Sequence, residues 1–171
     1  MMHRDLPPTR ILFLCLGNIC RSPQAEGIFL RQVRDAKLEH EFLIDSAGTS
    51  HYHIGDDPDW RTQRTSEKHG VPLDHKGRQF TIADFDTFDH ILVMDRSNLH
   101  DVVQLTRSEA DRAKVKLLRE YDQLADAASV PDPYYGTGDG FENVYQICWA
   151  ACRGLLRTLR PDAFSGRAAL P

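Results

Sequence analysis

The sequence predicts a single α/β domain in which a four-stranded parallel β-sheet is flanked by helices on both faces. Four short apolar runs typical of buried strands alternate with longer segments whose apolar residues recur at helical spacing. This alternation favours a mostly parallel sheet covered on both faces. The 171 residues contain no internal repeat, low-complexity stretch or domain boundary, so one domain is expected over 1–171, with a core at about 10–160. The ends, 1–8 and 161–171, are expected to be loosely held.

The first strand is predicted at residues 10–15, where the run RILFLC leads directly into a glycine-containing turn. Ser22 and Pro23 follow and are typical of a helix start, with the serine as N-cap and the proline in the first turn. Apolar residues then recur three or four positions apart, which predicts a helix to about Leu38. The run FLID at residues 42–45 predicts the second strand.

The second half of the chain continues the alternation. A helix is predicted over residues 58–69, because Gly70 is a typical helix stop. The run HILVMD at residues 90–95 is the strongest buried-strand signal of the chain. The remaining elements are expected to be a helix at 99–105, a strand at 115–118 and a long amphipathic helix at 141–159. Sheets of this kind bind ligands beyond the carboxyl ends of their strands, and Cys15 stands at one such end.

The charge and the apolar runs exclude several classes of function. The formal net charge is −4, and no run of lysine or arginine is dense enough to bind nucleic acid or a membrane surface. No stretch reaches the length of a transmembrane helix, and the first apolar run lacks the cleavage site of a signal peptide. Since no export signal is predicted, the four cysteines of the chain should stay reduced. We expect a cytoplasmic monomer that binds anions locally, with backbone amides and particular arginines.

Residues 15–22 have the composition of an anion-binding loop at a helix start. Between Cys15 and Arg21 lie five residues, Leu16, Gly17, Asn18, Ile19 and Cys20. The free amides of a helix N-terminus carry partial positive charge, and Gly17 and Asn18 readily adopt the positive φ that turns successive N–H groups toward one centre. The planar guanidinium of Arg21 could hold two phosphoryl oxygens at once. The loop therefore predicts a phosphate site.

The same groups would make Cys15 a nucleophile, because each of them favours the thiolate over the thiol. Ser22 can donate a hydrogen bond to the sulfur, both before attack and when it leaves a phosphocysteine intermediate. This scheme requires no metal ion and no other cofactor. The alternative is that Cys15 is an ordinary buried cysteine, which the preceding strand, the Gly-Asn turn and the Ser-Pro helix start make less favourable.

Hydrolysis of an aryl phosphate also needs an acid that protonates the leaving oxygen. The run PDPYYG at residues 131–136 offers Asp132, which would act as a base toward water in the second step. Flanking prolines stiffen this loop, and Tyr134 and Tyr135 could supply an aromatic wall for the substrate ring. Taken alone, an aspartate beside a proline is typical of a turn, so the functional interpretation depends on its pairing with Cys15.

Four ordered motifs carry a family resemblance: CLGNICRSPQAE, DSAGTS, MDRSNL and PDPYYG. Together they resemble the low-molecular-weight protein tyrosine phosphatase family, and the match covers about residues 10–160. The resemblance implies a four-stranded parallel sheet, Cys15 as nucleophile, Arg21 as phosphate ligand and Asp132 as general acid. The expected substrates are then tyrosine-phosphorylated proteins or peptides.

The resemblance also implies residues that support the loop or line the substrate cleft. A hydrogen-bonded network that holds the phosphate loop is implied for Asn18, Ser22, Ser46 and His75. Ring-lining aromatics are implied at Tyr52, Tyr134 and Tyr135. Asp95 and Asn98 match family positions near the site. Gly48 and the residues around His51 and His53 depart from the family pattern, which leaves the specificity of the cleft rim open.

A structural zinc site is one alternative, and it would use the four cysteines, Cys15, Cys20, Cys148 and Cys152. However, Cys148 and Cys152 lie one helical turn apart among apolar residues and are typical of a helical core. His51 and His53 alternate in a polar loop, as solvated histidines commonly do. No metal site is therefore assigned.

Three further alternatives use the same loop: an arsenate reductase, an arginine-phosphate phosphatase and a phosphate-binding module without turnover. The reductases of this fold need a further cysteine pair, and residues 75–130 contain no cysteine. The arginine-phosphate enzymes resemble this loop except for a threonine at the position of Ile19. Isoleucine should pack on an aromatic ring and offers no hydroxyl to a guanidinium leaving group. The intact nucleophile, acid and arginine disfavour a module without turnover.

Overall fold

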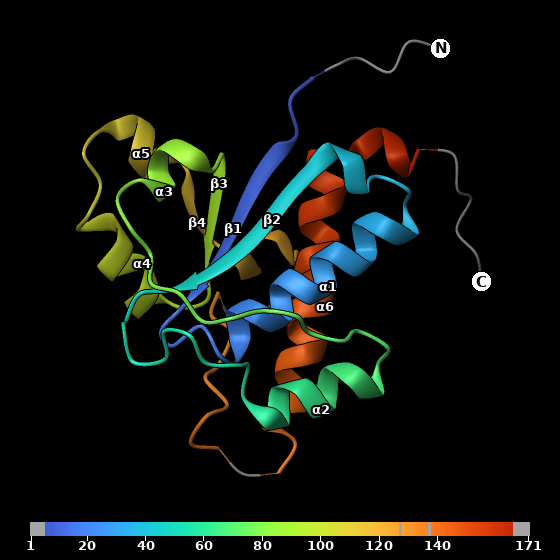
Figure 1. Ribbon diagram of the computed structural model, residues 1–171. Helices are drawn as coiled ribbons and strands as arrows, with labels where there is room; N and C mark the ends of the chain where they lie inside the picture. The colour runs from blue at the N-terminus through green and yellow to red at the C-terminus, as the bar shows by residue number, and fades with distance from the viewer. Residues whose placement is uncertain (1–5, 127, 137, 166–171) are drawn as a thin grey trace.

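The computed structural model describes residues 6–126, 128–136 and 138–165. Its centre is a four-stranded parallel sheet in the order β2-β1-β3-β4 (Figure 1). The strands are β1 (Thr9–Cys15), β2 (Phe42–Gly48), β3 (His90–Val93) and β4 (Val115–Leu117). The predicted fold class and all four predicted strands are confirmed.

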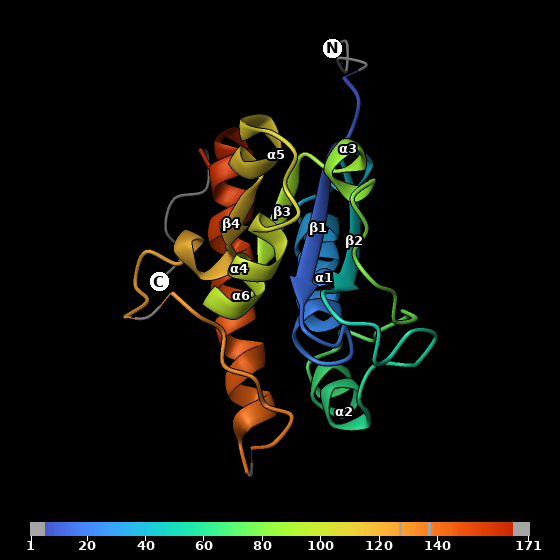
Figure 2. The same ribbon diagram turned by 90° about the vertical axis from the view of Figure 1, so that its left-hand side faces the viewer.

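Helices cover both faces of the sheet, as Figures 1 and 2 show. One face carries α1 (Arg21–Asp35) and α6 (Gly140–Leu159). The other carries α3 (Asp84–Thr87), α4 (Arg96–Val103) and α5 (Glu109–Ala113). Beyond the carboxyl ends of the strands lies α2 (Trp60–Lys68), which contacts α1 and α6. Short 3₁₀ helices occur at η1 (Glu39–Glu41), η2 (Leu118–Tyr121) and η3 (Pro161–Ala163).

The central strand β1 explains why an unbroken apolar run is needed here. Ile11, Phe13 and Cys15 face the core cluster built with α1 and α6. Leu12 and Leu14 alternate with them and face the second cluster, under α3 and α4. Since successive side chains of a strand point to opposite faces, a strand covered on both faces must be apolar at every position. The strand thereby presents Cys15, 2 % exposed, at its carboxyl end.

Several element boundaries differ from the prediction. Helix α1 begins at Arg21, so Cys20 and not Ser22 occupies the N-cap position, and it ends at Asp35 instead of near Leu38. The Ser22 hydroxyl is used inside the phosphate loop, where it contacts the sulfur of Cys15. Strand β2 continues through Gly48 because its last residues pair with β1. Helices α3 and α5 are four and five residues long, which is too short to give a periodic signal.

The end expected to be loosely held is ordered where it begins. Residues Pro161–Ala163 form η3, and Phe164 packs against the core cluster under α1 and α6. The guanidinium of Arg157 lies 5.6 Å from the centroid of the Phe164 ring. Residues 1–5 and 166–171 of the two predicted loose ends lie outside the described residues. None of the helices that the structure describes is long and apolar enough to cross a membrane.

Substitution of Gly154 by alanine should destabilise the fold. This glycine lies on α6 where η2 crosses it, and an added Cβ would meet the carbonyl oxygen of Tyr121 at 1.9 Å. We expect Gly154→Ala to lower the free energy of unfolding by about 2–4 kcal/mol, because the two backbones must separate. Urea unfolding measures the loss. Gly140→Ala is the control, since a Cβ there meets its nearest atom at 3.8 Å; equal losses in both variants would contradict the clash.

Candidate active site

A cleft opens beyond the carboxyl ends of β1 and β2. Its volume is about 320 Å³. The lining residues come from the 15–21 loop, the 52–53 segment and the 132–135 segment, and they are Cys15, Leu16, Gly17, Ile19, Cys20, Arg21, Tyr52, His53, Asp132, Tyr134 and Tyr135. The structure therefore brings together the predicted nucleophile, phosphate ligand, acid and aromatic residues, although they lie far apart in the sequence.

The 15–21 loop turns its carbonyl groups outward. The Cys15 carbonyl accepts from Thr49 N at 2.8 Å, and that of Leu16 accepts from Ser50 N at 3.0 Å. On the other side, the Ile19 carbonyl accepts from Asp59 N at 2.8 Å. The C=O and N–H of a trans peptide point in opposite directions, so the amides that follow these carbonyls face the inside of the loop. This is the geometry of an anion-binding nest.

Asn18 makes the sharp turn in this loop. It is 1 % exposed and has φ = +56°, a region that asparagine tolerates better than most residues. Its backbone amide donates to the Cys15 sulfur at 3.3 Å. The expectation of a positive φ at Gly17 is wrong. The glycine instead lets the His53 ring lie close to the loop, since a Cβ there would be 3.1 Å from Cδ2 of His53 and the ring would have to shift by a few tenths of an ångström.

The Cys15 sulfur has a hydroxyl partner as well as an amide. Its Sγ lies 3.0 Å from Oγ of Ser22, at the buried start of α1. Ser22 Oγ accepts from Nδ2 of Asn18 at 2.8 Å, and it lies 3.3 Å from the Ala47 carbonyl. The single hydroxyl proton of Ser22 can be donated either to the Ala47 carbonyl or to the sulfur, and a negative charge on the sulfur favours the sulfur. A thiolate at Cys15 would receive two hydrogen bonds within the protein.

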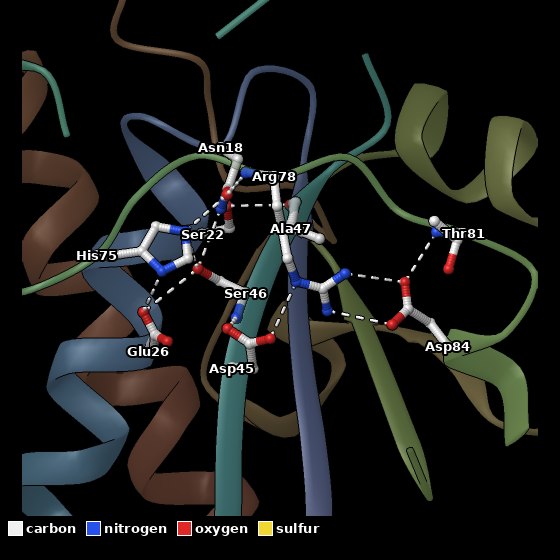
Figure 3. Close-up of polar contacts among 10 residues, drawn as sticks. All are labelled: Asn18, Ser22, Glu26, Asp45, Ser46, Ala47, His75, Arg78, Thr81 and Asp84. Carbon is white, nitrogen blue, oxygen red and sulfur yellow. Dashed lines mark hydrogen bonds and ion pairs between the residues drawn. The ribbon is translucent and has the colours of Figure 1, made fainter. Parts of the chain in front are cut away.

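The side chain of Asn18 is the centre of the supporting network (Figure 3). Its Nδ2 also donates to Ser46 Oγ at 3.0 Å. Its Oδ1 accepts from the backbone N of Arg78 at 3.0 Å and lies 2.7 Å from Nε2 of His75. Because a backbone N–H can only donate, it fixes the orientation of the Asn18 amide, and His75 must then donate from Nε2. Asn18, Ser22, Ser46 and His75 are therefore in one connected set of contacts.

Glu26 extends this network and was not predicted. Its Oε2 lies 3.4 Å from Nδ1 of His75 and accepts from Ser46 Oγ at 3.3 Å. Burial raises the pKa of Glu26 to about 8, and burial lowers the pKa of His75. Glu26, Asp45 and His75 have potential metal-ligand atoms within 4.8 Å of one another. However, the imidazole is committed to Asn18 and Glu26, and Asp45 to Arg78, so these groups act as hydrogen-bond partners here.

Arg21 is 2 % exposed and is oriented by contacts outside the loop. Its Nη1 donates to Asp95 Oδ2 at 2.6 Å and to the Val130 carbonyl at 3.0 Å. Nη2 makes a longer contact, 3.4 Å, with Asp132 Oδ2. Burial alone would lower the pKa of Arg21, but the negative groups that face it outweigh burial and raise the pKa. These groups are the Cys15 sulfur and the carboxylates of Asp95 and Asp132.

Asp132 stands at the rim of the cleft, with a side chain that is 40 % exposed. Its Oδ1 accepts from the backbone N of Tyr134 at 3.1 Å, which is the local bond typical of an aspartate turn. The Tyr134 and Tyr135 rings pack edge to face, with centroids 4.8 Å apart. Tyr52 and Tyr135 are 69 % and 92 % exposed. The rings therefore stand around an open mouth, while the sulfur and guanidinium lie at the buried base.

Ile19 and Cys20 are more buried than a loop mouth suggests. Ile19 is 8 % exposed and Cys20 is 5 % exposed, and they form a small cluster with Phe141 of α6. Ile19 still contributes to the cleft wall. Burial raises the pKa of the Cys20 thiol to about 12. Leu16, in contrast, is exposed at the cleft edge.

The remaining predicted residues lie at the start of α4 and in the core. Asp95 is the N-cap of α4 and accepts from the backbone N of Asn98 at 2.8 Å, so it anchors that helix while it holds Arg21. Cys148 and Cys152 are buried in the core cluster under α1 and α6, as expected for helical core residues.

His53 is a cleft residue for which the sequence predicts no role, although the residues around His51 and His53 depart from the family pattern. Its Nδ1 lies 3.0 Å from Asp56 Oδ2, and its ring is 6.4 Å from that of Tyr134. A lone histidine in a polar loop carries no signal that could have distinguished it from its neighbour His51.

Comparisons with known proteins agree with this geometry. The family model described as low molecular weight phosphotyrosine protein phosphatase matches residues 10–164. The chain is 48 % identical over 147 residues to the low molecular weight phosphotyrosine protein phosphatase of Gallus gallus, which covers 85 % of this chain and 92 % of the relative. It is 44 % identical over 162 residues to the low molecular weight protein-tyrosine-phosphatase of Streptomyces coelicolor, with 94 % and 98 % covered. A crystal structure of the protein tyrosine phosphatase of Entamoeba histolytica superposes with a TM-score of 0.86 at 33 % identity and covers 90 % of this chain and 98 % of its own. The chain belongs to the low-molecular-weight phosphotyrosine protein phosphatase family.

Proposed function

We propose that the chain hydrolyses phosphotyrosine in proteins or peptides through a phosphocysteine intermediate on Cys15, with Arg21 and the loop amides as phosphate ligands. The observation that supports this most directly is the convergence of Cys15, Arg21 and Asp132 on one cleft. The sulfur is buried at the base, the carboxylate is at the rim, and aromatic rings stand around the mouth. A phosphotyrosine could therefore place its phosphate at the base, its ester oxygen near the carboxylate and its ring between the aromatic side chains.

In the first step the Cys15 thiolate attacks phosphorus, and the bond between phosphorus and the tyrosine oxygen breaks. The inward loop amides and Arg21 stabilise the charge that develops on the phosphoryl oxygens. A phosphate that occupies Arg21 would replace the 3.4 Å contact between Nη2 and Asp132. Asp132 is then free to donate its proton to the leaving phenolate oxygen.

In the second step a water molecule attacks the phosphorus of the phosphocysteine. The Asp132 carboxylate takes the proton of that water, and the bond between sulfur and phosphorus breaks. Inorganic phosphate leaves, and the Cys15 thiolate is regenerated. The Ser22 hydroxyl, 3.0 Å from the sulfur, and the Asn18 amide stabilise the thiolate as a leaving group.

The cleft wall favours phosphotyrosine over phosphoarginine and phosphoserine. Ile19 presents an apolar side chain beside the base, and Tyr52 and Tyr134 supply ring faces at the mouth. An apolar, ring-lined wall packs on a phenyl ring, whereas a guanidinium in that place would lose hydrogen bonds to water. Phosphoserine has a shorter side chain than phosphotyrosine. Its phosphate should therefore not reach the buried sulfur unless its backbone enters the cleft.

Exchange of Ile19 for threonine should narrow this preference. We expect wild type to hydrolyse phosphotyrosine peptides best, and Ile19→Thr to lose about 10–100-fold of its selectivity over phosphoarginine, since a hydroxyl replaces an ethyl group in the wall. Values of kcat/KM on phosphotyrosine, phosphoarginine and phosphoserine peptides of one sequence measure the effect. Ile54→Thr, an exposed isoleucine, is the control. A wild-type preference for phosphoarginine would overturn the substrate assignment.

We also expect the enzyme to work as a cytoplasmic monomer, without nucleic-acid or membrane partners. The net charge of −4 supports the last two points, because nucleic acid and cytoplasmic lipid surfaces attract basic proteins. All four cysteines are free thiols, in keeping with a reducing compartment. Light scattering during gel filtration tests the monomer.

A further inference from the structure

We propose that Arg78, which touches neither the cleft nor the sulfur, is a positioning residue that sets the shape of the phosphate loop and of the cleft rim together. The inference rests on the proposed function for its meaning, although its main test does not need turnover. It depends on the segment 75–78, which runs past the ends of β1 and β2 and has contacts on both sides (Figure 3).

The first side of this segment holds the phosphate loop. Asn18 Oδ1 accepts two hydrogen bonds, and both come from the segment, one from His75 Nε2 at 2.7 Å and one from Arg78 N at 3.0 Å. Asn18 carries the positive φ of the loop and its amide contacts the sulfur of Cys15. A displacement of the segment would therefore move the turn that shapes the loop.

The second side of the segment holds the rim of the cleft. Gly55 N donates to the Gly77 carbonyl at 2.8 Å, and Gly77 N donates to the Asp56 carbonyl at 2.8 Å. A Cβ on Gly77 would lie 2.2 Å from the His53 carbonyl oxygen. The rim segment that carries Tyr52 and His53 is thus in close backbone contact with residues 75–78.

Arg78 fixes the position of the segment through its own side chain. Its Nε donates to Asp45 Oδ2 at 3.0 Å, and its two Nη atoms donate to the two oxygens of Asp84 at 3.1 Å each. Asp84 is 6 % exposed and also accepts from Thr81 N at 2.8 Å. Asp45 belongs to β2 and Asp84 to α3, so the guanidinium joins the segment to the sheet and to a helix.

The backbone of Arg78 is committed as well. Its N–H donates to Asn18 Oδ1. Its carbonyl accepts from Gly48 N, at the end of β2, at 2.8 Å. A lysine at this position would keep the charge but could not form the planar, two-oxygen contact with Asp84. The segment would then lose its fixed distance from both carboxylates, although no residue that would contact phosphate is itself substituted.

The matched control is Arg107. Its guanidinium also joins two aspartates, Asp86 of α3 and Asp111 of α5, with two donors to Asp86. It lies away from the cleft. Arg78→Lys and Arg107→Lys therefore remove the same kind of contact, and urea unfolding shows whether their stability losses are comparable.

The test measures the affinity for inorganic phosphate by titration calorimetry in the wild type and both variants. We expect Arg78→Lys to weaken phosphate binding by about tenfold or more, because small displacements of a binding constellation have effects of this size. Arg107→Lys should stay within about twofold of the wild type. Should Arg78→Lys fail to fold, Asp84→Asn removes the charge of the same pair and is expected to act in the same direction.

A second variant separates the rim from the loop. Gly77→Ala displaces the His53 carbonyl, so we expect the ratio of kcat/KM on phosphotyrosine to that on phosphoserine to fall by about three- to tenfold. Phosphate affinity should fall less than in Arg78→Lys, because Gly77 itself makes no contact with Asn18, whose Oδ1 is held by residues 75 and 78.

Two outcomes would overturn the inference. One is an unchanged phosphate affinity in Arg78→Lys at a stability loss equal to that of Arg107→Lys, because Arg78 would then be a structural residue only. The other is an unchanged substrate ratio in Gly77→Ala. If wild type bound phosphate but did not hydrolyse phosphotyrosine, the proposed function would fail, while the calorimetry would still decide the role of Arg78.

Discussion

Replacement of Cys15 by serine should abolish turnover of phosphotyrosine, with a fall in kcat of roughly 10⁴–10⁶-fold, the range seen when an enzyme loses its covalent nucleophile. A serine hydroxyl at this position stays protonated at neutral pH, and the described hydrogen-bond partners of the Cys15 sulfur include no base: they are the Ser22 hydroxyl at 3.0 Å and the Asn18 backbone amide at 3.3 Å. The loop that binds phosphate is unchanged. Initial rates with p-nitrophenyl phosphate and a phosphotyrosine peptide measure the loss.

Two further measurements show whether Cys15 itself carries the phosphate. Rapid acid quench of the wild type followed by peptide mass analysis should recover phosphate on Cys15. Cys20→Ser is the control within the same loop, and we expect a loss below about tenfold, because the burial that raises the Cys20 pKa to about 12 keeps this thiol protonated. Substantial turnover in Cys15→Ser, or phosphate recovered on another residue, would contradict the covalent scheme.

The fold was predictable because its strands are covered on both faces. Such strands are apolar at successive positions, as in β1, where Ile11 to Cys15 alternate between the two core clusters. The boundaries were harder, since they depend on tertiary contacts. Ser22 has the sequence of an N-cap, but its hydroxyl contacts Cys15 Sγ and accepts from Asn18, and the helix begins two residues earlier than predicted, at Arg21.

The site residues likewise include some that the sequence predicts and others that only the tertiary structure identifies. Cys15 and Arg21 lie in one short run, so local sequence reveals their pairing, and the family motifs add the aromatic residues and the loop support. No role was predicted for Glu26, His53 or Arg78, although Glu26 ends the first family motif. Each is an ordinary polar residue in sequence and gains its role from the fold, Glu26 by facing His75 from α1 and Arg78 by reaching two aspartates on different elements. Their contribution depends on distances that only the tertiary structure sets.

Asp132→Ala should lower kcat on phosphotyrosine by about 10²–10⁴-fold, the usual range for loss of a general acid or base. Asp132 is the cleft-lining carboxylate at the rim, 3.4 Å from Arg21 Nη2, so it lies on the side where the leaving oxygen would emerge. Phosphate affinity should hold or rise slightly, because the variant removes a carboxylate that competes for Arg21. Asp139→Ala is the control, since this exposed aspartate follows on the same connection but does not line the cleft.

The leaving group distinguishes an acid from a residue that only shapes the loop. A phenolate of low basicity departs without a proton, so p-nitrophenyl phosphate should suffer less in Asp132→Ala than phenyl phosphate or phosphotyrosine does. A loop distortion caused by loss of the bond to Tyr134 N would slow all aryl phosphates alike. Asp132→Asn retains an acceptor for that bond but has no proton to donate as an acid. Near-normal turnover of phosphotyrosine by Asp132→Asn would return this residue to the role of a turn former and assign the proton to another group.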